Sequence, residues 1–195
     1  MIARLADSLR ETGLSDLHAA HHAGRYENTF QTMLPWLPPV GAVRDFLDIG
    51  CGYGGVAMWM AGRYPDATAH LIDGDGSEKW VGYREDGQAW ADVRIAVRLF
   101  EKHCPGRAVK AYRPDPAKTI PCDLIWSNVS WGHHYPIETY LDLALRSLRA
   151  GGTLIVDLRL GEVGEHGEDV LARHFIRKGT AHTGKKYTRT VWARA

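Results

Sequence analysis

The segment Phe46-Leu47-Asp48-Ile49-Gly50-Cys51-Gly52-Tyr53-Gly54-Gly55 decides the fold of this chain. Its first residues form a short apolar run, as in a buried parallel strand, and the glycines that follow end that strand. Apolar residues at helical spacing then continue to Arg63, which predicts a helix. A glycine turn between a strand and a helix lets the backbone approach a ligand closely, at the positive end of the helix dipole.

The same alternation of strand and helix recurs along the chain. Further strands are predicted at 69–73, 109–112, 122–127 and 153–158, with helices at about 88–103, 137–148 and 167–174. We expect residues 128–136 to form a loop and Gly151-Gly152 to cap the helix before the fifth strand. This alternation predicts a parallel sheet covered by helices on both faces, with ligands at the carboxyl ends of the strands.

The two ends of the chain depart from this alternation. Residues 1–37 carry apolar positions at helical spacing and are stopped by prolines, which predicts two or three short helices before the sheet. Apolar and polar residues alternate in 187–192, which predicts a closing antiparallel hairpin with the segment that follows Phe175.

Composition bounds the class of protein. With 195 residues, 45% of them hydrophobic, the chain is expected to form one domain with a sizeable core. Its net charge of +1 supplies no global field for a polyanion, which disfavours nucleic-acid binding. The three cysteines contain no CxxC pair, which argues against a disulfide framework or a thiolate zinc site. No apolar window suits a signal peptide or a membrane span, so we expect a cytoplasmic protein.

The position of Asp48 distinguishes two kinds of ligand. Gly50, Gly52 and Gly55 satisfy the GxGxxG fingerprint of dinucleotide-binding domains, so a nicotinamide or flavin site is one reading. A carboxylate two residues before the first glycine would repel a pyrophosphate, whereas it suits a ligand that carries an ammonium and a sulfonium. The electrostatics therefore favour the cationic ligand.

The same residues resemble a known family. Asp48, Gly50, Gly52 and Gly54 match the first motif of the class I S-adenosylmethionine-dependent methyltransferases, an acidic residue followed after one position by GxGxG. Segments 122–128 and 148–154 look like the family's fourth motif and the joint before its fifth strand, so the resemblance covers roughly residues 43–160. In that family an acidic residue ending the second strand binds the ribose hydroxyls of the cofactor, and Asp73 stands at the matching place.

The resemblance implies an α/β fold with a doubly wound, mostly parallel seven-stranded sheet, a C-terminal antiparallel hairpin and N-terminal lid helices. The lid would comprise residues 1–40 and the Rossmann-like methyltransferase domain residues 41–195, packed as one unit. It also implies S-adenosylmethionine as the cofactor. The cofactor-binding residues that we expect are Asp48, Gly50, Cys51, Gly52, Gly54, Asp73, Gly74, Asp115 near the adenine amino group, Ser127, Asn128 and Tyr26 in the lid.

A base is needed if the methyl acceptor is a hydroxyl group. Segment Ser130-Trp131-Gly132-His133-His134-Tyr135-Pro136 supplies two imidazoles, and it loosely resembles an SWGxHxP loop of presumed sugar O-methyltransferases. We therefore predict His134 as general base, with His133 second, and a small hydroxylated acceptor such as a sugar or glycosylated metabolite. An alternative reading is that these histidines only cap a helix or bond within the loop.

Other functions stay open. The acceptor atom is a nitrogen in one alternative, on a small molecule, a protein or an RNA, and a non-catalytic cofactor- or nucleotide-binding module is another. The [DN]PP[YF] motif of DNA amino-methylating enzymes is replaced by Asn128-Val129-Ser130-Trp131, which disfavours DNA adenine methylation. His18, His21 and His22 lie at helical spacing without acidic partners, so we predict no metal. The sequence leaves the oligomeric state open, a homodimer included.

Overall fold

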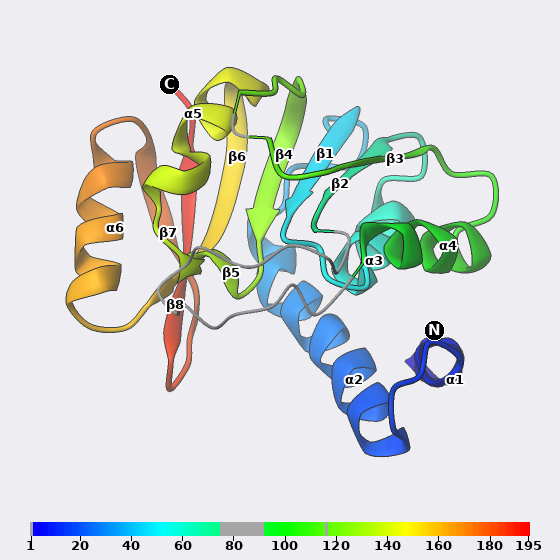
Figure 1. Cartoon of the computed structure of the whole chain (residues 1–195). Coiled ribbons are helices and arrows are strands. Elements are labelled where there is room, and N and C mark those ends of the chain that lie inside the picture. The colour runs from blue at the N-terminus through cyan, green and yellow to red at the C-terminus, as the bar shows by residue number, and fades with distance from the viewer. Residues whose placement is uncertain (1, 75–91, 116) are drawn as a thin grey trace.

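The computed structural model describes residues 2–74, 92–115 and 117–195. A central sheet of seven strands runs in the order β3-β2-β1-β4-β6-β8-β7, with helices packed around it (Figure 1). The helices are α1 (Ile2–Glu11), α2 (Asp16–Met33), the short 3₁₀ helix η1 (Leu34–Trp36), α3 (Gly55–Arg63), α4 (Val93–His103), α5 (Glu138–Ser147) and α6 (Glu162–Ala172). The strands are β1 (Asp45–Ile49), β2 (Thr68–Ile72), β3 (Val109–Tyr112), β4 (Cys122–Ser127), β5 (Ser130–Tyr135), β6 (Leu148–Arg159), β7 (Ile176–Thr183) and β8 (Tyr187–Ala193).

The pairing of the strands confirms the predicted fold class. β1 pairs in parallel with β2 and β4, β2 with β3, and β4 with β6. β8 runs antiparallel to both β6 and β7, which makes the C-terminal hairpin. The order of the parallel strands reverses between β1 and β4, the point at which open α/β sheets bind ligands.

Alternate side chains of each strand enter different cores. In β1, Phe46 belongs to the core beneath α2, α3 and α4, whereas Leu47 and Ile49 belong to the core beneath α5 and α6. Because successive side chains of a strand point to opposite faces, Asp48 faces the same side as Phe46. The sequence therefore directs this carboxylate toward α2 and α3.

Three local predictions need correction. The expected loop 128–136 contains the strand β5, which lies outside the seven-stranded sheet order. Gly151 and Gly152 do not cap a helix, because β6 begins at Leu148 and includes both glycines. Gly151 has φ of +72° at a register shift against β4, so the glycines form an irregularity within a long strand. Helix α6 begins at Glu162, earlier than the expected Gly167.

Helix α4 is shorter in the described part of the chain than the prediction of 88–103. It begins at Val93, and the side chain of Asp92 accepts a hydrogen bond from the backbone N–H of Arg94 as a helix N-cap. Residues 75–91, which include the predicted first turn of this helix, lie outside the described residues.

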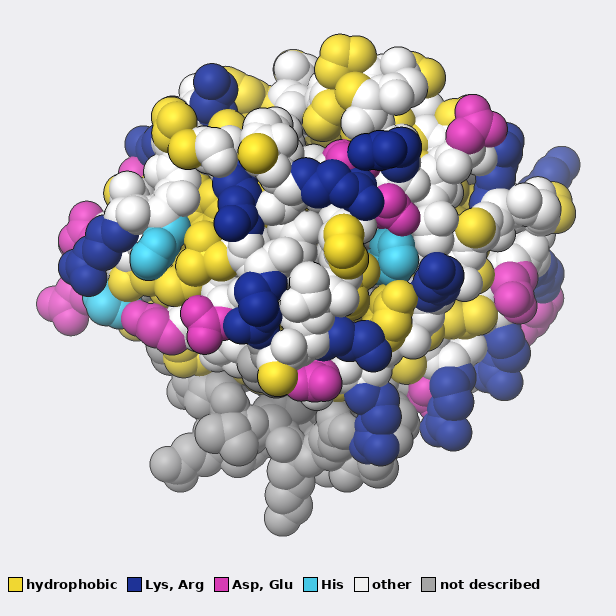
Figure 2. All heavy atoms as spheres, turned by 90° about the horizontal axis from the view of Figure 1, so that it is seen from above, with side chains coloured by type: hydrophobic (Ala, Val, Ile, Leu, Met, Phe, Trp, Pro, Cys, Tyr) yellow, Lys and Arg dark blue, Asp and Glu magenta, His cyan; other side chains and the backbone are white. Residues whose placement is uncertain are grey.

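The surface mixes both signs of charge. The face seen from above in Figure 2 carries Lys and Arg side chains interspersed with Asp and Glu, in keeping with a net charge of +1. Within the described part of the chain, no helix combines the length and apolar character needed to cross a bilayer.

A buried ion pair joins the hairpin to the rest of the sheet. Arg189 of β8 lies directly opposite Asp157 of β6 and binds it in bidentate fashion, with Nε–Oδ1 and Nη2–Oδ2 distances of 2.7 and 2.8 Å. Both side chains are buried. The guanidinium also donates to the hydroxyl of Thr32 in α2 at 2.6 Å and to the side-chain oxygen of Asn128 at 3.0 Å. One side chain thus connects β6, β8, α2 and the segment after β4.

We predict that Arg189→Met lowers the free energy of unfolding by about 3–5 kcal/mol, because it leaves the Asp157 carboxylate buried without its partner. Denaturant unfolding followed by circular dichroism measures the loss. The matched control is Arg177→Met in the same hairpin, whose exposed pair with Glu168 is expected to contribute at most about 1 kcal/mol. Equal losses for the two variants would show that the buried pair does not hold the hairpin.

Candidate functional site

The glycine turn after β1 depends on backbone conformations that glycine adopts freely. Gly50, Gly52 and Gly54 have φ of +72°, +57° and +73°, in the left-handed region. Gly54 is the N-cap residue of α3, so the first amides of that helix open toward the turn. A side chain at Gly50 would overlap Ser130, and one at Gly55 would overlap the ring of Tyr26. The turn is therefore packed between β5 and α2.

Asp73 braces the turn from the neighbouring strand. It follows the last residue of β2, and its carboxylate accepts hydrogen bonds from the backbone N–H of Gly52 at 2.6 Å and of Gly74 at 2.8 Å. The structure thus places Asp73, Gly52 and Gly74 together, as predicted.

Asp48 lies at the centre of a narrow cavity beneath α2. The described residues that line this cavity are His22, Arg25, Tyr26, Asp48, Gly50, Cys51, Gly52, Val56 and Asn128. The side chain of Asp48 is buried, and its pKa is raised well above the usual range by burial and by the nearby charge of Asp73. A buried carboxylate with a second carboxylate nearby makes an environment that a cation would stabilise. We call this site the Asp48 cavity.

The Asp48 cavity is closed by α2. Its volume is about 20 Å³, enough for roughly one water molecule, so a larger ligand requires α2 to shift. Tyr26 of α2 is buried there with its hydroxyl lacking a hydrogen-bond partner in the described structure, and burial raises its pKa. An unpartnered buried hydroxyl beside the turn is a polar group that a ligand can satisfy.

The two predicted residues at the end of β4, Ser127 and Asn128, have different roles. The Ser127 hydroxyl donates to the backbone oxygen of Ile49 and accepts from the backbone N–H of Trp131, both at 2.8 Å. Ser127 therefore fastens the end of β1 to β5. Asn128 lines the Asp48 cavity and is held by Arg189.

Asp115 is placed differently from the other predicted residues. It is exposed after β3, and its carboxylate accepts a hydrogen bond from the backbone N–H of Ala117 at 3.0 Å. The carboxylate thus caps its own turn, and it is not among the residues that line the Asp48 cavity. Its contact with an adenine stays a prediction.

Both predicted histidines lie on β5 and line a second cavity, of about 520 Å³. Their ring centroids are 4.6 Å apart, in an edge-to-face arrangement. His133 is buried with its Nδ1 atom unpartnered in the described structure, and its pKa is lowered to about 4, mainly by burial and then by the charges of His134, Arg159, Arg25 and Lys186. His134 is half-buried. Arg25 lines this cavity and the Asp48 cavity, so the two adjoin at its side chain.

Sequence reasoning missed several residues of this second cavity. Lys185, Lys186 and His182 reach it from the β7–β8 hairpin, and no spacing rule links them to β5. Arg189 was also missed, although a signal for it exists. Asp157 stands alone in an apolar strand, and a buried carboxylate requires a cationic or hydrogen-bonding partner.

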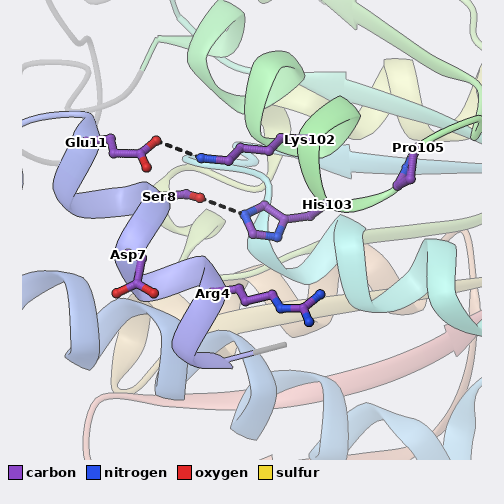
Figure 3. Close-up of a pocket in the computed structure, with 7 residues that line it drawn as sticks. All are labelled: Arg4, Asp7, Ser8, Glu11, Lys102, His103 and Pro105. Atoms are coloured by element: carbon purple, nitrogen blue, oxygen red, sulfur yellow. Dashed lines mark hydrogen bonds and ion pairs between the residues drawn. The ribbon is translucent and has the colours of Figure 1, made fainter.

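A further cavity, of about 530 Å³, lies between α1 and α4 (Figure 3). There Glu11 and Ser8 of α1 point toward α4, where Glu11 pairs with Lys102 at 2.7 Å and Ser8 bonds with His103 at 3.0 Å. These two contacts join α1 to α4 beside the cavity. Among the described residues, no cluster of three or more His, Cys, Asp or Glu side chains has metal-binding geometry.

Solved structures share this architecture. The pyocyanin biosynthetic protein PhzM superposes with a TM-score of 0.65 at 17% identity, over 92% of this chain and 58% of PhzM. Protein PH0226 from Pyrococcus horikoshii OT3 gives 0.59 at 16% identity, over 87% of this chain and 91% of the other. A geranyl diphosphate methyltransferase in complex with GPP and sinefungin gives 0.63 at 14% identity, over 87% and 77%.

Sequence comparisons find no match, either to a protein-family model or to a curated protein. The chain spans little more than half the length of PhzM, so the likeness concerns the domain and not the whole of that protein. Together with the sheet order and the glycine turn, the structural likenesses show that the chain has the fold of the class I S-adenosylmethionine-dependent methyltransferases.

Proposed function

We propose that this chain binds S-adenosylmethionine at the Asp48 cavity and methylates a hydroxyl group of a small molecule held in the cavity of His133 and His134. The observation that carries the proposal is the pair of carboxylates, Asp48 and Asp73, at the ends of adjacent strands around a left-handed glycine turn. The fold agrees with this assignment, since several structural neighbours are methyltransferases.

The residues present fit this cofactor. Asp48 is buried and its ionised form is costly, so a ligand with an ammonium and a sulfonium recovers free energy that a diphosphate cannot. Asp73 stands at the turn, where a carboxylate can accept hydrogen bonds from ribose hydroxyls, and Arg25 and Tyr26 of α2 supply a cation and a hydroxyl for the carboxylate end.

Methyl transfer requires the protein to align the acceptor hydroxyl with the methyl group and to remove the proton of that hydroxyl. S-adenosylmethionine, when bound, supplies an electrophilic methyl group on sulfur. His134 is the proposed base because it is half-buried at the cavity, whereas the lowered pKa of His133 makes that imidazole the weaker base. A cavity of about 520 Å³ suits a small molecule, such as a sugar or a glycosylated metabolite.

Two neighbours support an oxygen acceptor. One is an O-methyltransferase family protein from Burkholderia thailandensis, and another is a family 2 O-methyltransferase from Planctomyces limnophilus in complex with apigenin. Both are less than 20% identical to this chain, so they support the class of acceptor atom and not the acceptor itself.

Asp48→Asn is predicted to weaken S-adenosylmethionine binding while stabilising the ligand-free protein. Loss of the negative charge removes an attraction to the cationic ligand, at a cost of roughly tenfold to a hundredfold in Kd. It also removes a buried charge. Because the folded pKa of Asp48 lies above its unfolded value, this destabilising contribution is complete above the folded pKa, declines as the pH falls below it and vanishes once the pH reaches the unfolded pKa.

Titration calorimetry with S-adenosylmethionine and thermal unfolding between pH 4 and 8 test both halves of this prediction. The control is Asp66→Asn, an exposed aspartate that lines neither cavity. The melting-temperature gain of Asp48→Asn over wild type is expected to shrink toward acidic pH. Saturable binding of NAD by the wild type, or S-adenosylmethionine affinity indifferent to Asp48, would refute the cofactor assignment.

His134→Ala is predicted to reduce turnover by about 10²–10⁴-fold while leaving the Kd for S-adenosylmethionine near the wild-type value. His174→Ala, at an exposed position after α6, serves as the control. Initial rates with a panel of hydroxylated and amino acceptors, measured against pH, give the readout. The acceptor is instead a nitrogen if an amine is methylated at the same rate by the wild type and by His134→Ala, and if the pH profile of that reaction shows no ionisation of an imidazole.

A further inference from the structure

Basic side chains make up much of the lining of the cavity that holds His133 and His134, beside uncharged residues such as Asn28 and Thr29. Arg25 of α2, Lys185 and Lys186 of the β7–β8 hairpin, and His21 and His182 face it together with the two histidines of β5. An adjoining cavity of about 400 Å³ shares His133, Lys185 and Lys186 and adds Arg159. We call the two together the basic cavity.

The segregation of charge is the informative feature. The chain as a whole has 24 basic and 23 acidic residues, so a surface chosen without regard to sign would contain both. Among the described residues that line the basic cavity, none is acidic. Within the described part of the chain, Arg25, Lys185 and Lys186 also form no ion pair, in contrast to Arg149 and Arg189. Like charges brought together without counter-charges are a cost that an anionic ligand offsets.

The backbone holds the two lysines at the cavity. The hairpin loop is closed by a hydrogen bond from the N–H of Gly184 to the oxygen of Tyr187, at 2.9 Å. The backbone oxygen of Lys186 accepts a hydrogen bond from the N–H of Leu160 at 3.0 Å, which ties the loop to the end of β6. Lys185 and Lys186 are exposed, so their ammonium groups remain hydrated and able to exchange water for a ligand.

His133 responds to this positive field. Its imidazole packs edge-on against Tyr187, with ring centroids 6.0 Å apart, and the surrounding cations add to burial in favouring its neutral form. A neutral imidazole has one acceptor and one donor nitrogen, and Nδ1 is unpartnered in the described structure. The positive field of the cavity therefore acts on His133, whose Nδ1 atom is itself buried.

We propose that the methyl acceptor carries a phosphate group, which Lys185 and Lys186 bind in the basic cavity. A phosphate monoester has close to two negative charges and three acceptor oxygens, which match several cations better than a single carboxylate does. The assignment of this ligand as the acceptor rests on the proposed function. The site itself rests only on the lining of the cavity.

The dimensions favour a small phosphorylated molecule over a nucleic acid. The volumes of about 520 and 400 Å³ suit a metabolite, and the net charge of +1 supplies no extended field along which a polyanion would bind. We therefore expect the anion to be recognised locally.

Inorganic phosphate is the probe for this site, with acetate at equal ionic strength as a singly charged comparison. We expect saturable phosphate binding by ³¹P NMR titration, with acetate clearly weaker. Lys186→Glu is expected to weaken phosphate binding about tenfold or more, since a charge-assisted hydrogen bond is worth about 1.5–3 kcal/mol. Lys178→Glu makes the same charge change at an exposed position in β7, outside the basic cavity, and is expected to leave binding unchanged.

Parallel calorimetry with S-adenosylhomocysteine separates this inference from the proposed function. The inference is supported if Lys186→Glu loses phosphate binding but binds S-adenosylhomocysteine with normal affinity. Its link to catalysis is supported if phosphorylated members of an acceptor panel are methylated in preference to unphosphorylated members. Equal phosphate binding by the Lys186 and Lys178 variants would overturn the site. Tighter Lys186-dependent binding of a short RNA would overturn the small-molecule ligand. If the protein binds phosphate through Lys186 but does not bind S-adenosylhomocysteine, the proposed methyltransferase function is refuted and the phosphate site is not.

Discussion

The buried pair of Arg189 and Asp157 is the constraint on which both cavities depend. Two charges that are removed from water are stable only if their hydrogen-bonding groups find partners. Here the partners come from separate segments: Thr32 of α2, Asn128 after β4, and the backbone N–H of Val129, which donates to Asp157 at 3.1 Å. Because the buried pair of Arg189 and Asp157 needs all of these partners, α2, the hairpin and the end of β4 pack together at the carboxyl edge of the sheet.

The backbone at Val129 shows what this meeting requires. Val129 has φ of +54°, a left-handed conformation that a β-branched residue adopts only when its surroundings enforce it. The hydrogen bond to Asp157 holds its N–H, and the preceding Asn128 is held by Arg189. As a result Asn128 faces the Asp48 cavity while Val129 lines the basic cavity. The left-handed conformation of Val129 therefore lets two consecutive residues face different cavities.

The sequence predicted the parts of the site that follow from local pattern. Asp48 and Asp73 end two apolar strands, and the carboxyl ends of adjacent parallel strands meet, so their proximity followed from the alternation of strands and helices. β5 was not predicted because Gly132, His133 and His134 do not form a strand by composition, and the strand is fixed by tertiary contacts such as the bond from the Trp131 indole to Ile137 at 2.6 Å. Lys185 and Lys186 could not be assigned, because their role depends on where the hairpin folds back. Asp115 was named by analogy of position, and its own turn uses its carboxylate.

The two cavities have opposite charge preferences although they adjoin at Arg25. The Asp48 cavity contains a buried carboxylate with the charge of Asp73 nearby, so it disfavours a phosphate and favours a cation. The basic cavity does the reverse, with lysines from the hairpin and an imidazole held neutral in the positive field. A cationic cofactor and an anionic acceptor would therefore each be repelled from the other's site, and they would meet only at the boundary that α2 covers. On this view the orientation of the two ligands arises from the opposite signs of the neighbouring cavities, because the sheet edge brings β1, β2 and β4 together on one side and β5 and the hairpin on the other.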